Sequence, residues 1–294
     1  MWLTSRAVAL VAITMQATFS VRTEMVVLPV TVTDARGKHV AGLTASDFRV
    51  FDEGRLVPIS IFQRGEIPIT IGLVVDHSQS MRSKLGAVTS AASAFARLAN
   101  EDDEFFVVMF SNDVRRPAFS SGELFTSDPA ELDAALAARI PSGQSAIYDA
   151  VAEGLRHLPG GTSPRKALIL VTDGGDNASR TKYGDVRDLA RQSGAVIYGI
   201  GLLGATSQEE NPDLLRRLCR DTGGAAFFPG PDETVRDIFA AIARDLHEQY
   251  TLSIPSGAAL PGREVHSIRV TATGADGKKL TVRTRTSYEA RTAK

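Results

Sequence analysis

Four short and almost wholly apolar stretches are the feature that most restricts the fold of this chain. They cover residues 69–75, 105–110, 167–172 and 195–200. The segments between them have the apolar spacing of amphipathic helices. Strands that are apolar throughout and alternate with helices are typical of a parallel sheet covered on both faces. We therefore predict an α/β domain with a doubly wound, mostly parallel sheet over about residues 67–247.

The two flanks of this domain have a different character. Residues 24–66 and 248–290 contain strand-like runs and turn residues, and no helical pattern interrupts them. The turn residues at 275–277 predict a hairpin between runs at 267–273 and 280–286. Neither flank alone has enough strands for a stable core. We expect the flanks to pair into one β-sandwich with the α/β domain inserted between them; two separate β-meanders are the alternative.

The N-terminal residues have the pattern of an export signal. Arg6 precedes an apolar stretch at 7–15, and small residues follow it. Residues 1–20 are therefore interpreted as a secretory signal peptide. This predicts a protein in the periplasm, the cell envelope or the medium, or in the cytoplasm if the segment has another role. No later segment has the roughly 18 uninterrupted apolar residues of a spanning helix, so no transmembrane span is expected.

Charge and cysteine content exclude several classes of function. The chain has 33 Lys and Arg against 34 Asp and Glu, a net charge of −1. Such a balance gives no electrostatic reason to expect nucleic acid or a membrane surface as partner. Cys219 is the single cysteine, which rules out an intramolecular disulfide, and no Cys/His spacing suggests zinc.

Oxygen-bearing side chains follow two of the apolar runs. Asp76, Ser78 and Ser80 come directly after the first run, and Asp173 comes after the third. Ser145 precedes a helix expected at 146–158, where it would be the N-cap. The carboxyl ends of parallel strands share one edge of a sheet, and that edge is where ligands bind.

Oxygen ligands select hard divalent cations. The five residues therefore predict a site for Mg²⁺, with Mn²⁺ or Ca²⁺ as alternatives. Only two of them are carboxylates, so the ion would keep the ability to accept a carboxylate from outside. His77 and Gln79, the intervening positions of the first motif, are expected to face solvent. The competing interpretation is that Asp76 and the serines only cap the following helix.

The three motifs, in this order, resemble the metal-ion-dependent adhesion site of the von Willebrand factor A domain. The resemblance covers about residues 67–247. It implies that Ser78 and Ser80 ligate the ion directly and that Ser145 stands where the family usually has threonine. Asp76 and Asp173 would act directly or through waters. Residues 28–34 and 42–48 further resemble a group of exported bacterial proteins that carry this domain.

These observations lead to a functional expectation. We expect a non-enzymatic, metal-dependent module whose ion accepts an acidic residue of a partner protein. A metal-dependent hydrolase or phosphoryl-transfer enzyme is one alternative, although it needs a general base and only His77 is near in the sequence. A structural envelope subunit with a stabilising metal is the other. In some members of the resembled family the last helix shifts along its axis when the ion gains a ligand. Here a helix expected at 232–249 leads directly into a strand, so such a shift would be transmitted to the β-sandwich.

Overall fold

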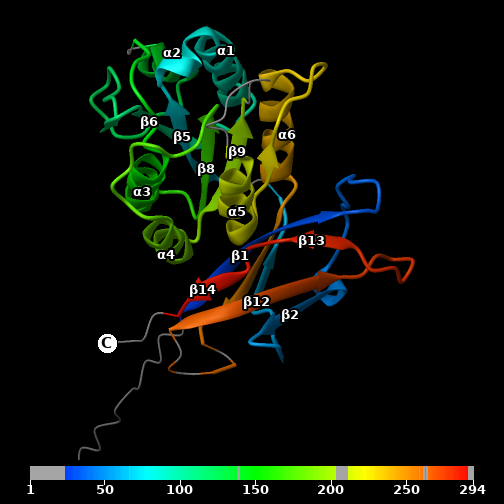
Figure 1. The fold of residues 1–294 in the computed structure, drawn as a ribbon. Helices are drawn as coiled ribbons and strands as arrows, with labels where there is room; N and C mark the ends of the chain where they lie inside the picture. Colours follow the sequence, from blue (N-terminus) through cyan, green and yellow to red (C-terminus); the bar gives the residue numbers. More distant parts are fainter. Residues whose placement is uncertain are drawn as a thin grey trace, which may run out of the picture.

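The computed structural model describes residues 24–65, 67–137, 140–202, 211–257, 259–260, 262 and 264–290. The chain forms an α/β part built on a six-stranded sheet and a β-sandwich of two four-stranded sheets (Figure 1). The predicted signal peptide at residues 1–20 lies outside the described residues. Within the described part, no helix has the length and apolar content needed to cross a membrane.

The four apolar runs form the middle of the larger sheet, whose strand order is β10-β9-β8-β5-β6-β7. The four central strands are parallel: β5 (Ile69–Asp76), β6 (Glu104–Phe110), β8 (Arg165–Thr172) and β9 (Val196–Gly201). Short edge strands complete the sheet, β10 (Ala226–Phe227) parallel to β9 and β7 (Val114–Arg115) antiparallel to β6. The predicted mostly parallel sheet is therefore confirmed.

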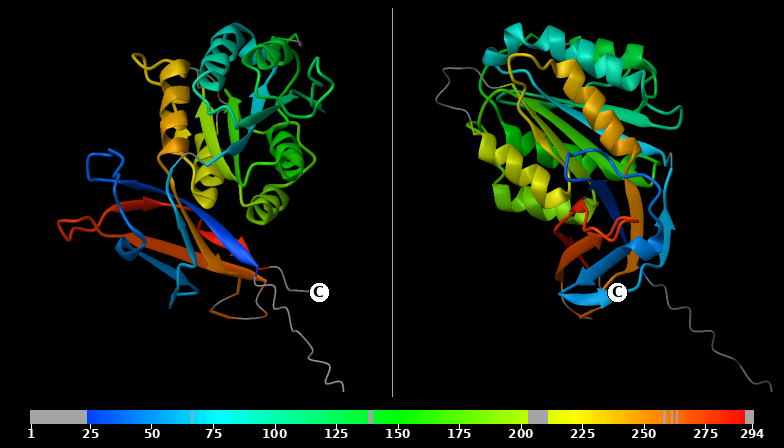
Figure 2. Two further views of the ribbon diagram at one scale, coloured as in Figure 1. Left: turned by 180° about the vertical axis from the view of Figure 1, so that it is seen from behind. Right: turned by 90° about the vertical axis from the view of Figure 1, so that its right-hand side faces the viewer.

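Helices cover both faces of this sheet, as Figure 2 shows. One face packs against α1 (Leu85–Ala96), α2 (Pro129–Ala137) and α6 (Val235–His247). The other packs against α3 (Ile147–His157), α4 (Tyr183–Ser193) and α5 (Pro212–Thr222). Every residue of β5 is buried, because its side chains alternate between these two cores. Short 3₁₀ helices occur at Ala45–Asp47, Gln79–Ser83 and Leu158–Gly160.

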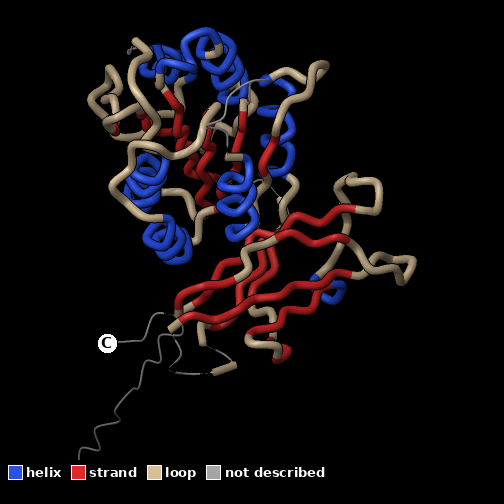
Figure 3. The backbone as a smooth tube through the Cα atoms, in the orientation of Figure 1, coloured by secondary structure: helices blue, strands red, loops and turns tan. Residues whose placement is uncertain are grey.

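The β-sandwich consists almost wholly of strands and loops (Figure 3), and its strands come from both ends of the chain (Figure 1). One sheet has the order β13-β1-β11-β4, with β1 (Met25–Thr33), β4 (Ile61–Gln63), β11 (Tyr250–Pro255) and β13 (Thr281–Arg283). The other has the order β14-β12-β2-β3, with β2 (Phe48–Asp52), β3 (Arg55–Val57), β12 (Val265–Ala272) and β14 (Ser287–Glu289). Because β1 pairs with β11 and β2 with β12, the flanks form one sandwich and not two separate meanders.

Two strand-like runs of the flanks do not form continuous strands, so the expectation of one strand for each is wrong. In the N-terminal flank, residues 56–62 have the pattern of one strand, but this run breaks at Pro58, which has no N–H for a ladder, into β3 and β4 of different sheets. Within the run at 280–286 only β13 is a strand, because Thr284 bonds to the Pro29 carbonyl and the Thr286 N–H to that of Asp221; β14 begins after the run and joins the other sheet. The predicted turn exists, with a 2.8 Å bond from Gly274 N to Lys278 O, but its two strands enter different sheets.

A buried polar network joins the two parts of the molecule. Asp245, near the end of α6, accepts hydrogen bonds from the hydroxyls of Thr31 at 2.9 Å and Tyr198 at 2.5 Å. Arg283 of β13 also bonds to this carboxylate. One side chain therefore connects α6 with both the parallel sheet and the sandwich.

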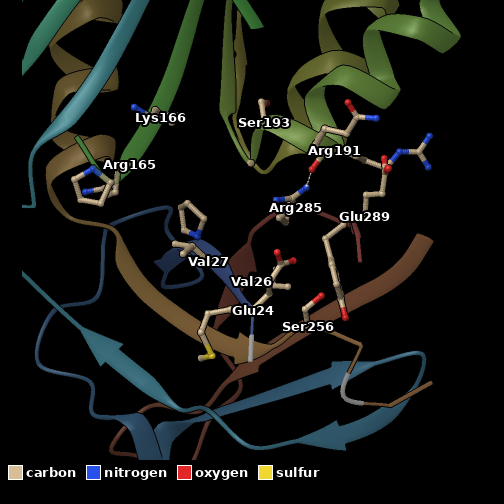
Figure 4. A pocket seen from close by; sticks show the side chains of 16 residues that line it. Glu24, Val26, Val27, Arg165, Lys166, Arg191, Ser193, Ser256, Arg285 and Glu289 are labelled. Carbon is tan, nitrogen blue, oxygen red and sulfur yellow. Dashed lines mark hydrogen bonds between the residues drawn. The ribbon is translucent and has the colours of Figure 1, made fainter. Parts of the chain in front are cut away.

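The same junction contains a cavity of about 370 Å³, shown in Figure 4. Arg285 lies in it and donates to the carbonyls of Ser287 and Arg191. Burial, together with the charge of nearby Arg191, lowers the pKa of Arg285 to about 10, so it stays charged at neutral pH. Arg191 is in the last turn of α4, so the Arg285 cation that bonds to its carbonyl complements the carbonyl end of this helix. This contact also holds the two parts of the molecule together.

Candidate metal centre

The predicted site residues come from three loops at the carboxyl edge of the parallel sheet, the end remote from the sandwich (Figure 1). Asp76 is the last residue of β5, and Asp173 directly follows β8. These two strands pair in parallel, with Val75 opposite Val171, which places both acids at neighbouring strand ends. Ser145 lies two residues before α3.

Asp76 is fully buried and accepts several hydrogen bonds. Its Oδ1 atom accepts from the backbone N–H of Ser78 at 2.7 Å. Its Oδ2 atom accepts from the hydroxyls of Thr172 at 2.6 Å and Ser145 at 3.0 Å. Burial nevertheless raises the pKa of Asp76 above its ordinary value, and the hydrogen bonds from Thr172, Ser78 and Ser145 offset this only in part. A cation beside this carboxylate would favour its ionised form.

Asp173 forms the second half of the cluster. Its Oδ1 atom accepts from the Ser80 hydroxyl at 2.8 Å, and the Ser78 and Ser80 hydroxyl oxygens are 3.2 Å apart. Its Oδ2 atom lies 2.5 Å from the ammonium nitrogen of Lys84. The structure thus brings all five predicted residues together, since each is hydrogen-bonded to another member of the set.

The chemistry of this donor set fits a hard divalent cation. All five side chains offer oxygen, and three of them are neutral hydroxyls. Among the described residues, no group of three or more His, Cys, Asp and Glu could hold a metal ion. A centre built here would therefore depend on hydroxyls and two carboxylates, which suits Mg²⁺, an ion that commonly keeps exchangeable ligands.

Two expectations about individual side chains were wrong. Ser145 is not the N-cap of α3; Ala146 holds that position, and the Ser145 hydroxyl is directed to Asp76. His77 does not face solvent but is completely buried. Its ring nitrogens lie 3.2 Å from the carbonyl oxygens of Val75 and Leu136, because the ring is covered by the end of α2. Gln79 is exposed, as expected.

The loop after β8 supports the site. Asp176 accepts from the backbone N–H of Tyr148 at 3.1 Å, and Asn177 accepts from that of Ser145 at 2.8 Å. Both side chains therefore fix the first turn of α3 and the loop before it relative to the loop after β8.

Two residues of the cluster were missed by the sequence analysis. Thr172, which bonds to Asp76, directly precedes Asp173 and was counted only as part of a strand. Lys84 follows Ser80 by four positions and was not considered. The nearness of both residues to the motifs was the available signal.

The fold and the oxygen cluster define the class of protein: an α/β domain with a hydroxyl-rich site at the carboxyl edge of its sheet. Residues 70–241, more than half of the chain, match the family model described as the von Willebrand factor type A domain. The chain belongs to this family. A comparison with curated proteins found no match.

Solved structures with the same fold are distant in sequence. The von Willebrand factor type A protein from Catenulispora acidiphila has 14% identity and a TM-score of 0.53, over 82% of this chain and 75% of that one. Proximal thread matrix protein 1 from the mussel byssus has 19% identity and a TM-score of 0.52, over 66% of this chain and 49% of that one. A further structure of the mussel protein, with 18% identity, 66% and 49% coverage and a TM-score of 0.50, is described as having a zinc-occupied MIDAS motif. The chain spans about half the length of the mussel protein, and at these identities the likeness concerns the fold.

Proposed function

We propose that this protein is a non-enzymatic, metal-dependent binding module of the adhesion type. A divalent cation held by Asp76, Ser78, Ser80, Ser145 and Asp173 would accept an acidic side chain of a partner protein. The observation that carries the proposal is the cluster itself: three hydroxyls and only two carboxylates, hydrogen-bonded together at one strand edge.

The ion would supply Lewis acidity at this edge. Ser78 and Ser80 are proposed as direct ligands, Ser145 as the third hydroxyl, and the two aspartates as ligands that act directly or through water. Two carboxylates do no more than balance the charge of a dication, and the hydroxyls add none, so the ion would keep Lewis acidity for a carboxylate from outside. Mg²⁺ is the proposed ion and Mn²⁺ or Ca²⁺ the alternatives. The zinc in the mussel protein makes the identity of the ion part of the test.

A non-enzymatic role is supported by the position of His77. This residue was the only candidate for a general base near the motif, and its buried ring nitrogens approach two backbone carbonyls. A hydrolase or phosphoryl-transfer enzyme would have to take its base from elsewhere.

The remaining parts of the chain fit such a module. We propose that residues 1–20 direct export, that residues 67–247 are the binding domain, and that residues 24–66 and 248–290 form the supporting sandwich. The sandwich lies at the amino end of the parallel strands, so the metal edge faces away from it (Figure 1). A partner could therefore reach the metal edge without displacing the sandwich.

The test combines metal binding with partner capture. Mn²⁺ and Mg²⁺ binding is measured by calorimetry for the wild type, for Asp173→Ala and for the distant control Asp213→Ala. The same three proteins are then used to capture binding proteins from an envelope extract of the source organism, with Mg²⁺ or with chelator. The proposal expects metal binding and capture by the wild type and the control, and neither by Asp173→Ala.

Two outcomes would favour the other functions. Hydrolysis of simple phosphate esters that is lost in Asp76→Ala would indicate the enzyme. A lower melting temperature of Asp173→Ala, with an unchanged set of captured proteins, would indicate a metal that only stabilises the fold.

A further inference from the structure

Lys84 is fixed against the cluster by two acceptors on neighbouring strand ends. Its ammonium nitrogen lies 2.5 Å from Oδ2 of Asp173 and donates to the carbonyl oxygen of Leu202 at 2.9 Å. Asp173 follows β8 and Leu202 follows β9. The Asp173 side chain is 3% exposed and that of Lys84 is 32% exposed. The cation is therefore held in a defined position at the wall of the site and still reaches solvent.

The position of Lys84 in its own helix does not explain this arrangement. Lys84 is the N-cap residue of α1, where its side chain makes no capping bond. A positive charge at the N-terminus of a helix is disfavoured by the helix dipole. The pairing with Asp173 compensates for that position, and it directs the charge into the oxygen cluster.

The ammonium group changes the charge of the site. The two carboxylates carry two negative charges, and Lys84 reduces their sum to one. With a divalent cation bound, the site would carry one positive charge, which a carboxylate ligand would neutralise. Without Lys84 the same complex would be neutral before the carboxylate arrived and negative afterwards, which disfavours binding.

The same charge also acts on the metal. Lys84 and a divalent cation attract the same carboxylate and repel each other, so the lysine opposes cation binding. We propose that Lys84 is a built-in counter-cation that weakens the affinity of the site for its metal and strengthens its preference for an acidic ligand. This inference rests on the metal site proposed above.

The experiment removes the charge and keeps the bulk of the side chain. Lys84→Met is compared with the wild type and with Lys278→Met, which removes one exposed lysine from a sandwich turn and changes the net charge equally. Mn²⁺ is titrated into each metal-free protein by calorimetry at low salt. Lys84→Met should bind Mn²⁺ about tenfold more tightly than the wild type, while Lys278→Met should match it.

A second measurement tests the preference for acids. Acetate is titrated into the Mn²⁺-loaded proteins as a carboxylate probe and followed by the loss of water-proton relaxation enhancement. Half-saturation should need several-fold less acetate in the wild type and in Lys278→Met than in Lys84→Met. A lysine with a purely structural role would leave the half-saturating acetate concentration the same in all three proteins.

The possible failures can be told apart. If the wild type binds no Mn²⁺, the proposed metal site is wrong and this inference is wrong with it. If the wild type binds Mn²⁺ and Lys84→Met binds it equally or more weakly, only the role of Lys84 is overturned. If Lys84→Met does not fold, Lys84→Gln carries the same comparison, because its amide can still donate to Asp173.

Discussion

The hydroxyl of Ser145 donates to Oδ2 of Asp76 over 3.0 Å, although the two residues lie 69 positions apart in the chain. This bond joins the loop before α3 to the end of β5. The backbone N–H of Ser145 is held in turn by Asn177, from the loop after β8. Three loops are therefore connected through one serine, which makes it the most direct test of the assembled cluster.

Replacing Ser145 by alanine should weaken Mn²⁺ binding about tenfold and lower the free energy of unfolding by about 1 kcal/mol, since one ligand and one buried hydrogen bond are lost. Ser145→Thr keeps the hydroxyl and should retain or slightly improve the affinity, because the added methyl restricts the rotamer. Ser142→Ala, an exposed serine in the same loop, is the control. Calorimetry provides the affinities, and equal binding by Ser145→Ala would remove Ser145 from the ligand set.

The sequence predicted the members of the cluster because their signal is local. Asp76 and Asp173 each stand next to an apolar run long enough to be recognised as a buried strand, and parallel strands bring such ends to one edge. The environment of His77 could not be predicted in this way, because its ring is enclosed by the carbonyl of Leu136, 59 positions later in the chain. Lys84 lies near the first motif in the sequence, but its pairing with Asp173, 89 positions later, is set by the fold.

The α/β part was also easier to predict than the sandwich. A strand buried on both faces, such as β5, is apolar over its whole length and stands out in the sequence. The sandwich strands are short and one-sided, and their partners lie at the far end of the chain, as β2 and β12 show. The run at 280–286 alternates like a single strand, but the bonds that end β13 within it involve Pro29 and Asp221, which no local pattern reveals.

A second prediction concerns the packing of β9 against the segment after α5. A Cβ atom on Gly224 would lie 1.9 Å from the carbonyl oxygen of Ile197, which is backbone and has no room to yield. Gly224→Ala should therefore lower the free energy of unfolding by about 3 kcal/mol. Gly230→Ala, where a Cβ meets nothing within 4 Å, should change it little. Urea denaturation measures the free energy of unfolding of both variants. Equal stability of Gly224→Ala and Gly230→Ala would contradict the close approach of Gly224 to Ile197.

A third prediction concerns the junction of the two parts. Asp245 is buried and bonds to Thr31, Tyr198 and Arg283. Removing this carboxylate leaves a partly buried guanidinium without its partner, so Asp245→Ala should cost about 3 kcal/mol of stability. Asp213→Ala, an exposed aspartate of α5, should be nearly neutral. Denaturation followed by far-UV circular dichroism measures the free energy of unfolding of both variants. A loss in Asp245→Ala no larger than that in Asp213→Ala would show that the network is dispensable.

The last prediction concerns pH and the amino end of the parallel strands. Oε1 of Glu104 accepts from the Thr70 hydroxyl at 2.6 Å and from the backbone N–H groups of Thr162 at 2.5 Å and Ser163 at 3.0 Å. Partial burial acts to raise the pKa of Glu104, but these hydrogen bonds outweigh it and hold the pKa below its ordinary value of 4.5. The ionised carboxylate is therefore favoured in the folded state.

The sign of the pH effect follows from this lowered pKa. The unfolded chain binds the proton more readily, so Glu104 stabilises the fold fully above pH 4.5 and loses this contribution as the pH falls through the folded pKa. Glu104→Gln should cost about 1 kcal/mol at pH 7, a value kept small because the group is largely solvated. The difference from the wild type should shrink in acid, while Glu101→Gln, an exposed neighbour, should show no such trend. Urea denaturation from pH 7 to pH 3.5 measures this difference in the free energy of unfolding. A difference that stays constant or widens in acid would mean that the charge of the Glu104 carboxylate does not hold Thr162 and Ser163 to β5.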